Sequence, residues 1–518
     1  MSKTNYILKV DWNNDGDFDD SNEDISSYLM DLNWGRGRNF ATNLTGTSVS
    51  GTLNATLLNT SGIFSPFKTD GALYGNMLPA RKVKLKIGDG SFPYTFPLTF
   101  NQDAWTGYLQ SIIPYPDLHG RETAVLTAIG SLGYLNSKEI SVAPQTSRRS
   151  DQAIGDILDA TGWSADDRDL DTGDMTITRF TVPADTKTID ALRMVEQSEN
   201  GFVSETKDGK IRFEKRKARF EDTKAITSQA TFTDATATDN LSFSVMTQED
   251  SLMNIFNEVL APFQQFTVAG ASTVWVHSET GSSSTSIVSG DTRTFRAVYP
   301  TPDSANATDS IDTWTTPASG TDYVGNTAAD GSGATISSDL AVSVTKTSQY
   351  MDIQITNNNA STGFLTTLQA RGTVVSQSDP TTMVKSDSTS QTTFGKRTFV
   401  TNAPFIPTSI EASNWCAYNL VRFKDPLQNI KIQFIANRND ATLDKAMTLD
   451  ISDRITLDAH TKINLMSADK DFFIESSHHS VDRDRTHAVE YQLSPISAIY
   501  KFWVIGVSLL ESETYISY

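Results

Sequence analysis

Oxygen-bearing side chains alternate along a short acidic segment near the N-terminus, DWNNDGDFDD at residues 11–20. The segment directly follows the apolar run 6–8, which predicts a strand. Carboxylate and amide oxygens at alternate positions match positions 1, 3, 5 and 7 of a calcium loop, and Gly16 stands where such a loop turns sharply. The residues at these four positions are Asp11, Asn13, Asp15 and Asp17. The pattern therefore predicts a structural Ca²⁺ site.

The end of this loop departs from the calcium pattern. Asn22 stands at the twelfth position, where a bidentate Glu is expected. The closing carboxylate would have to come from Glu23 or Asp24, over a slightly longer path. No helical pattern precedes the loop, so we expect it to join two strands and not two helices. The alternative reading is a solvated acidic turn without a metal.

Three of the six histidines flank one predicted hairpin near the C-terminus, His478, His479 and His487. They could hold a metal if two of the side chains met on the same face, but the chain contains no His-Glu-x-x-His zinc helix. His487 is in phase with the apolar positions 489, 491 and 493. We therefore expect packed, hydrogen-bonded strand histidines and no catalytic metal.

The remaining candidate catalytic groups favour structural roles. The single cysteine, Cys416, excludes an internal disulfide, and its place beside Trp415, one turn before Leu420, suits a small buried side chain. The sequence contains no Gly-x-Ser-x-Gly elbow and no phosphate-binding glycine-rich loop. We therefore expect a protein that is not an enzyme and needs no organic cofactor.

Composition bounds the class of protein. A length of 518 residues predicts roughly three to four domains, and the low hydrophobic fraction of 38% with abundant Thr, Ser, Asn and Asp favours β-structure with many turns. A net charge of -19 argues against sequence-specific nucleic-acid binding and against an anionic membrane. Neither a signal peptide nor a run of eighteen apolar residues is present, so we expect synthesis in a reducing cytoplasm and no stable membrane insertion.

Hydrophobic periodicity divides the first half of the chain into two units. Period-two patterns at 49–57 and 83–87, with further strands at 105–113 and 123–129, predict a small barrel or sandwich over residues 1–135. The pattern then becomes helical, with Ser150 as the expected N-cap of one helix and a second helix from Thr188. A hairpin turning at 208–209 follows, so residues 136–235 are expected to form a compact α+β unit.

The second half predicts a β domain split by an insertion. Strand patterning at 241–260 is interrupted by a Ser/Thr-rich stretch in which residues 351–355 alternate as in a strand, which favours an inserted β-sandwich over 266–394. After it, the capping box from Thr408 to Glu411 opens a helix, and strands resume at 430. The simplest organisation is a second barrel made of residues 236–265 and 395–518. The expected fold class is mainly β with a small α+β unit.

Several separated segments resemble, in the same order, the tail-hub proteins of tailed bacteriophages. The resemblance covers nearly the whole chain except about 265–340. The segments include VDWNNDGDFDDSNEDIS (10–26), LNWGRGR (32–38), LYGNMLPARKVKLKI (73–87), ALRMVEQSENGFVSETKDGKIRFEKR (191–216), DISDRITL (450–457) and the closing FWVIGVSLLESETY (502–515).

The resemblance implies a virion protein of the tail tip or baseplate. Such a hub is a homotrimer whose chains each contribute two tail-tube-like β-barrels, so that three chains imitate a sixfold ring and adapt it to the threefold tip. The implied partners are a distal tail protein or tail-tube ring, the tape-measure protein, tail fibre or spike proteins, and DNA passing transiently through the lumen during ejection. Carboxylates lining that lumen would keep DNA from sticking, although they could equally lie on the outer surface.

A second function class stays open at this point. A Ca²⁺-dependent surface adhesin or carbohydrate-binding β-protein would use the inserted sandwich, with Trp275 and Trp314 on its binding face. Burial of these tryptophans in the sandwich core is the favoured alternative. Oligomeric state separates the classes, because a hub should be trimeric around a channel.

Overall fold

The computed structural model describes residues 4–38, 48–89, 101–115, 122–235, 241–250, 254–277, 284–299, 310–347, 350–400, 403–460, 462, 465–496, 502–503 and 515–516. The chain is mainly β, as the sequence predicts, and its largest sheet contains 12 strands. We call this the main sheet. Most of the closing segment 502–515 lies outside the described residues.

Six strands make the N-terminal half of the main sheet: β1 (Thr4–Val10), β2 (Leu29–Arg38), β3 (Ser48–Leu58), β4 (Lys82–Asp89), β5 (Asn101–Tyr115) and β6 (Thr123–Ile129). A short helix, η1 (Ser26–Tyr28), lies between β1 and β2 in the chain. Their spatial order is β1–β4–β5–β6–β3–β2. Alternate residues are buried along β3 from Gly51, among them Leu53 and Leu57, which confirms the predicted period of two there, whereas Val49, at the start of the predicted run, is exposed. The buried face packs around Trp34 and Trp105.

The C-terminal half of the main sheet consists of β12 (Thr231–Thr233), β13 (Val245–Asp250), β25 (Gln428–Ile435), β26 (Arg454–Asp458), β27 (Lys470–Val481) and β28 (His487–Pro495). Their order is β27–β28–β25–β13, with β26 also on β27 and β12 on β26. After β25 come η6 (Ala436–Arg438) and α8 (Asp440–Thr448). This half has a core of its own, which includes Phe232, Phe434 and Tyr491.

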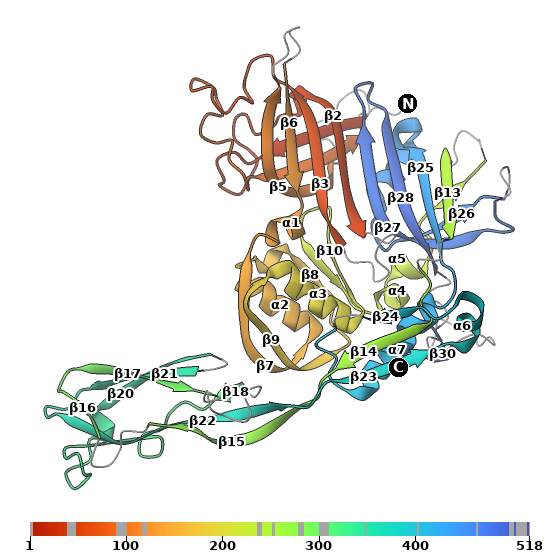
Figure 1. The fold of residues 1–518 in the computed structure, drawn as a ribbon. Coiled ribbons are helices and arrows are strands. Elements are labelled where there is room, and N and C mark those ends of the chain that lie inside the picture. Colours follow the sequence, from red (N-terminus) through yellow and green to blue (C-terminus); the bar gives the residue numbers. More distant parts are fainter. Residues whose placement is uncertain are drawn as a thin grey trace.

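A seam joins the two halves. β2 pairs antiparallel with β27, from Leu32 opposite Val481 to Gly37 opposite Ser476, so that the two halves stand side by side as one continuous sheet (Figure 1). A Cβ added at Gly37, whose φ is +131°, would lie 2.5 Å from the carbonyl oxygen of Glu475. Only glycine fits this close approach of two backbones.

The α+β unit lies next to the N-terminal half (Figure 1). It contains α1 (Ser131–Leu135), β7 (Glu139–Arg149), α2 (Ser150–Ala160), η2 (Ala165–Asp167), β8 (Arg168–Leu170), β9 (Thr176–Lys187), α3 (Thr188–Glu199), β10 (Phe202–Glu205), β11 (Ile211–Glu214), α4 (Ala218–Glu221) and α5 (Thr223–Ile226). β7 pairs with β9, and β10, β11 and β8 form a second sheet. Both predicted helices and the predicted hairpin are confirmed.

The N-cap predicted for the first of these helices is wrong. Ser150 is the first residue inside α2, and Arg149 occupies the N-cap position. The Ser150 hydroxyl is fully buried and donates to the Glu199 carboxylate at the end of α3. A tertiary hydrogen bond between two helices thus takes the place of the expected cap.

The inserted segment extends away from the rest of the molecule (Figure 1). Its elements are β15 (Phe266–Val276), β16 (Thr285–Ile287), β17 (Thr292–Val298), β18 (Ser310–Trp314), β19 (Tyr323–Asn326), η5 (Ser337–Asp339), β20 (Leu340–Lys346), β21 (Tyr350–Asn357) and β22 (Gly363–Gln377). β15, β16, β18 and β19 all pair with β22, and β17, β21 and β20 form a second sheet. Both sheets contribute to one core, which contains Trp314 and Ile353.

A three-stranded sheet lies at the base of the insertion and differs from the predicted organisation. β14 (Glu258–Phe263), expected in the second barrel, pairs with β23 (Thr381–Ser386) and β24 (Thr398–Val400). These strands pack on α7 (Ser409–Phe423), whose N-cap Thr408 accepts from the Glu411 amide as predicted, and α6 (Ser388–Phe394) is nearby. The last described pair is β29 (Phe502–Trp503) and β30 (Tyr515–Ile516). The domain boundaries as a whole stay a prediction.

Candidate functional site

The acidic loop between β1 and η1 brings together three of the six residues predicted as metal ligands. Asp11, Asp15 and Glu23 each place a carboxylate oxygen within 4.8 Å of the others. Asp11 and Glu23 are buried, whereas Asp15 is exposed. Burial raises the pKa of Glu23, and the nearby carboxylates of Asp11 and Asp20 add to this effect.

The other three predicted ligands make local hydrogen bonds. The Asn13 amide donates to Asp15 and Asp20. Asp17 accepts from the Asp19 amide at 3.2 Å. Asp24 accepts from the amide and hydroxyl of Ser26. Of the two residues proposed to close the loop, Glu23 is therefore the one that the fold directs inward.

Two of the three histidines near the seam, His479 and His487, are packed strand residues, as predicted. The prediction is wrong for His478, which is exposed on β27, because a register shift between Ile474 and Ser476 breaks the period of two. His479 Nδ1 lies 3.0 Å from His487 Nε2, and the His479 ring stacks on Trp34 with ring centroids 4.7 Å apart. Burial holds the pKa of His479 well below its usual range and lowers that of His487 to about 3. Both rings are therefore neutral at physiological pH and join the two halves of the main sheet.

Cys416 and Trp314 are also core residues, as predicted. Cys416 is fully buried in α7 against β14, and burial raises the pKa of its thiol to about 11. Trp314 is 4% exposed, and its indole nitrogen donates to the Thr347 carbonyl. Trp275 is half-buried against the same core. The tryptophans therefore do not present an exposed binding face of the kind that the adhesin reading requires.

Buried and partly buried charges join the α+β unit to both halves of the main sheet, in a region that we call the junction: Arg36, Arg38, Glu205, Lys207, Glu214, Arg219, Asp450 and Glu475. The junction begins with the hairpin β10–β11. Glu205 accepts from the backbone amides of Gly51 in β3 and Leu132 in α1. Burial raises its pKa to about 7, although these two hydrogen bonds lower it in part.

Lys207, at the turn of the same hairpin, reaches the C-terminal half. Its ammonium donates to the carbonyls of Met447 and, at 2.8 Å, Leu449, at the end of α8. A cation is stabilised there because the last carbonyls of a helix have no partner within the helix. Burial lowers the Lys207 pKa to about 8. One hairpin thus contacts both halves of the main sheet.

The arginines of the LNWGRGR segment enter the junction from β2. Arg36 donates to the Glu205 carbonyl and forms an ion pair with Asp450. Burial alone would raise the Asp450 pKa, but the cations Arg36 and Lys207 outweigh it and hold the pKa well below its usual range. The ion pair therefore keeps a partly buried carboxylate charged.

The deepest part of the junction is a bidentate pair between α4 and β27. Arg219 Nη1 lies 2.7 Å from Glu475 Oε1, and Nη2 lies 3.0 Å from Oε2. Glu475 also accepts from the Ser494 hydroxyl and lies 3.5 Å from Arg38. Burial would raise the Glu475 pKa, yet Arg219 and Arg38 hold it far below its usual range.

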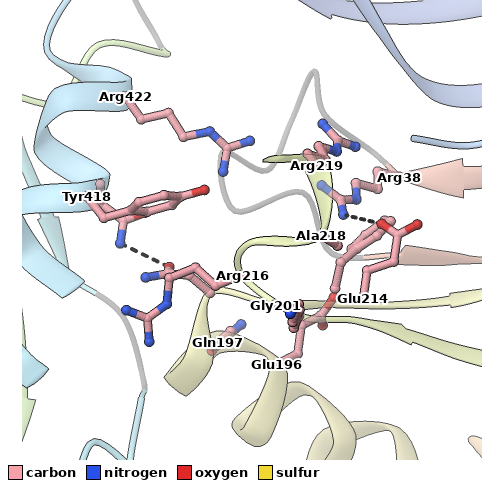
Figure 2. Close-up of a pocket in the computed structure, with 14 residues that line it drawn as sticks. Arg38, Glu196, Gln197, Gly201, Glu214, Arg216, Ala218, Arg219, Tyr418 and Arg422 are labelled. Carbon is pink, nitrogen blue, oxygen red and sulfur yellow. Dashed lines mark hydrogen bonds and ion pairs between the residues drawn. The ribbon is translucent and has the colours of Figure 1, made fainter. Parts of the chain in front are cut away.

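A small polar cavity of about 40 Å³ adjoins this pair, between the α+β unit and α7. Figure 2 shows Arg38 beside Glu214, with Arg422 and Tyr418 reaching in from α7. Across the same interface Arg216 pairs with Glu411, and the Trp415 indole donates to the Gln197 carbonyl. The cavity belongs to a polar interface that fixes α7 on the α+β unit.

Sequence reasoning missed the junction. The signals were two quoted segments, LNWGRGR at 32–38 and DISDRITL at 450–457, which carry Arg36, Arg38 and Asp450. The glycine and the arginines of LNWGRGR act together in the fold. Gly37 lets β2 approach β27, and the arginines on either side of it then reach the acidic residues Asp450 and Glu475. Within the described residues, no helix is long and apolar enough to span a membrane.

Comparison with solved structures identifies the fold. The tail protein from Neisseria meningitidis MC58 matches with a TM-score of 0.50 at 10% identity, over 94% of this chain and 96% of that one. The 43 kDa tail protein of prophage MuSo2 from Shewanella oneidensis matches with a TM-score of 0.45 at 9% identity, over 96% and 98% of the two chains. A prophage tail protein from Listeria monocytogenes reaches 0.42 at 8% identity, over 95% and 94%.

The sequence matches neither a protein-family model nor a curated protein. The likeness therefore rests on structure, and it extends over nearly the whole of both chains in the Neisseria match. This match shows that the chain has the fold of a tail protein, which confirms the fold that the sequence resemblance implies.

Proposed function

We propose that this chain is the structural hub of a phage tail tip or baseplate, a homotrimeric ring that closes the distal tail tube and forms the DNA-ejection channel. The observation that carries the proposal is the seam. Two β halves with separate cores continue into each other through β2 and β27, as two neighbouring subunits of a ring would. Three such chains supply six β units, which is how a threefold assembly can match a sixfold tube.

The junction supports a structural role in place of a catalytic one. Its charged groups are paired with one another or bound to backbone, as in Arg219 with Glu475 and Lys207 with the end of α8. Such an arrangement fixes the angle between the two β halves, because both halves are held by the same α+β unit. A ring subunit requires a fixed angle, since the angle determines whether the ring closes.

The proposed partners follow from this position. A hub in the virion contacts a distal tail protein or tail-tube ring on one side and tail fibre or spike proteins on the other, with the tape-measure protein in its lumen before ejection. DNA passes only transiently. The net charge of -19 favours release of DNA from the wall, because like charges repel.

The adhesin alternative is not favoured. It requires aromatic residues on an exposed face of the insertion, but Trp314 is core and Trp275 is half-buried. The insertion could still contact a neighbouring tail protein or a cell surface, as an accessory to the hub.

Immunolabelling of virions tests the proposal. Particles of a phage encoding this chain would be incubated with a gold-conjugated antibody against the purified protein and viewed by electron microscopy. We expect label at the distal end of the tail. Label along the tube, on the capsid, or absent from particles that bind a tube-specific control antibody would contradict the proposal.

A further inference from the structure

We propose that Asp11, Asp15 and Glu23 bind one Ca²⁺, which fastens the acidic loop to the outer edge of the main sheet. The proposal concerns the folded chain alone and does not depend on the proposed tail function. Of the six residues that spacing suggests, the proposal uses the three whose carboxylates the fold brings together.

The distances between the three carboxylates suit calcium. Their ligand oxygens lie within 4.8 Å of one another. Oxygens bound to calcium lie about 2.4 Å from the ion, so two ligands of the same ion are at most about 4.8 Å apart. Three carboxylates, some bidentate, together with water can complete the six to eight oxygens that calcium takes.

Glu23 gives the second observation that points to a ligand. Its side chain is 1% exposed, and its Oε1 has no hydrogen-bond partner, while Oε2 accepts from the Asp20 amide at 3.0 Å. A buried carboxylate oxygen without a partner is costly, and two further carboxylates beside it raise the cost. Within the described ranges, no lysine or arginine pairs with these three groups. A bound cation removes the penalty.

The loop holds Asp11 ready for a ligand. Its two oxygens accept from the backbone amides of Asn14 and, at 3.1 Å, Gly16. A carboxylate oxygen has two acceptor positions, so each keeps one for a metal. Asn14 and Gly16 both have positive φ, 64° and 100°, which curls the backbone around the carboxylate.

A second group of possible metal ligands in the same chain differs from the N-terminal group in burial and in hydrogen-bond partners. Asp458, His460 and Asp469 also lie close together, but His460 lies within ion-pair distance of both carboxylates, and none of the three is buried. These residues satisfy one another in water. The group near the N-terminus has buried carboxylates and no such partner.

The ion would fix the acidic loop to β1, the strand at the edge of the main sheet. Asp11 directly follows β1, and the Glu23 carbonyl accepts from the Val10 amide on the side of β1 away from β4. A metal shared by Asp11 and Glu23 therefore closes the loop at its two ends and covers part of the free edge of the main sheet. Exposed edges are sites of unwanted pairing between chains.

Two measurements on the full-length protein, freed of metal by a chelator, test the site. We expect Ca²⁺ to raise the melting temperature. We also expect Tb³⁺ to luminesce when tryptophan is excited, because Trp12 is buried in the loop and its indole donates to the Asn22 carbonyl at 3.0 Å. Added Ca²⁺ should suppress this luminescence.

Variants assign the response to the three residues. Asp15→Asn, at an exposed position, should weaken Ca²⁺ binding by about tenfold or more while the chain stays folded. Glu23→Gln should abolish the calcium shift without lowering the melting temperature in chelator, because it removes a repelling charge. Asp70→Asn makes the same charge change at an exposed position elsewhere and should leave the response intact.

Two outcomes would overturn the proposal. One is a wild-type chain with neither a calcium shift nor terbium luminescence. The other is a response that Asp15→Asn and Asp70→Asn change to the same extent, which would show weak binding to the acidic surface in general. Should Glu23→Gln fail to fold, Asp15→Asn alone decides between these outcomes.

Discussion

Arg219 and Glu475 lie 256 residues apart in the chain and form a bidentate ion pair inside the junction. Arg38 shares the same carboxylate from the other half of the main sheet. Glu475 therefore links the α+β unit and both β halves through a single side chain.

Removing this charge should destabilise the fold strongly. Glu475→Gln removes the ion-pair partner of buried Arg219 and leaves Arg38 with only the Glu214 carboxylate, 3.9 Å away, and breaking a buried pair in this way costs about 3–5 kcal/mol. Denaturant unfolding of the purified protein measures the loss. The control is Asp352→Asn, which breaks the pair of Arg296 with Asp352 on the solvent-exposed insertion and should change the stability little, because solvent screens an exposed ion pair. Equal losses for the two variants would show that the junction is not a special link.

Gly37→Ala should destabilise the seam. The substitution places a Cβ 2.5 Å from backbone atoms of Glu475 and Ser476, at a φ of +131° that other residues rarely adopt. The backbone strain alone is worth about 1–3 kcal/mol, and the steric overlap adds to it.

A matched glycine should respond with the opposite sign. Gly155 lies inside α2, and an added Cβ would meet only the Arg168 guanidinium, at 4.0 Å. Gly155→Ala should therefore stabilise the protein by about 0.4–1 kcal/mol. Thermal unfolding of both variants checks the pair of predictions, and a neutral Gly37→Ala would contradict the close approach of β2 and β27.

Acid should weaken the seam through the histidine pair. In the folded chain the pKa of His487 is about 3 and that of His479 is also well below the ordinary value of 6.5. Below pH 6.5 these two histidines therefore take up protons in the unfolded chain but not in the folded chain. The free energy of unfolding thus falls progressively as the pH drops from 6.5 towards 3. His487→Gln cannot take up this proton, so its melting temperature should fall less than that of the wild type between pH 7 and pH 5.

Glu205 and Glu196, a buried residue of α3, oppose this effect. Their pKa values are about 7 in the folded chain against 4.5 ordinarily, so between pH 4.5 and 7 the folded chain holds protons that the unfolded chain has lost. These two groups therefore stabilise the folded chain at low pH, and this stabilisation is lost as the pH rises from 4.5 to 7. Glu205→Gln should therefore increase the acid sensitivity, opposite to His487→Gln. A shift of the same sign in both variants would contradict these assignments.

Local pattern sufficed for elements whose burial is regular. β3 alternates from Gly51 to its end, and α2 and α3 carry their apolar residues at helical spacing, so the sequence predicts them closely. α8 was missed because its nine residues are mostly polar or small and bury only Thr442, Leu443 and Ala446. β7 and β9 were missed because their pairing contains two register shifts, which break the period of two.

The sequence likewise predicts a site whose residues lie close together in the chain, but not one assembled from distant elements. Asp11, Asp15 and Glu23 lie within one loop, so their spacing alone made them candidates, but spacing did not separate them from the carboxylates of Asp17 and Asp24, which lie outside the group. The junction joins residues from β2, α4 and β27, and no local pattern relates them. Tertiary contacts also turned Ser150 from an expected cap into a partner of Glu199.

The number of chains in the purified assembly tests the central claim most directly. Light scattering after size exclusion, followed by electron microscopy of the same fraction, gives both the mass and the symmetry. We predict a particle of three chains with threefold symmetry and a central channel lined by six β units. A single-chain globule, or a closed assembly without a channel, would contradict the proposed hub.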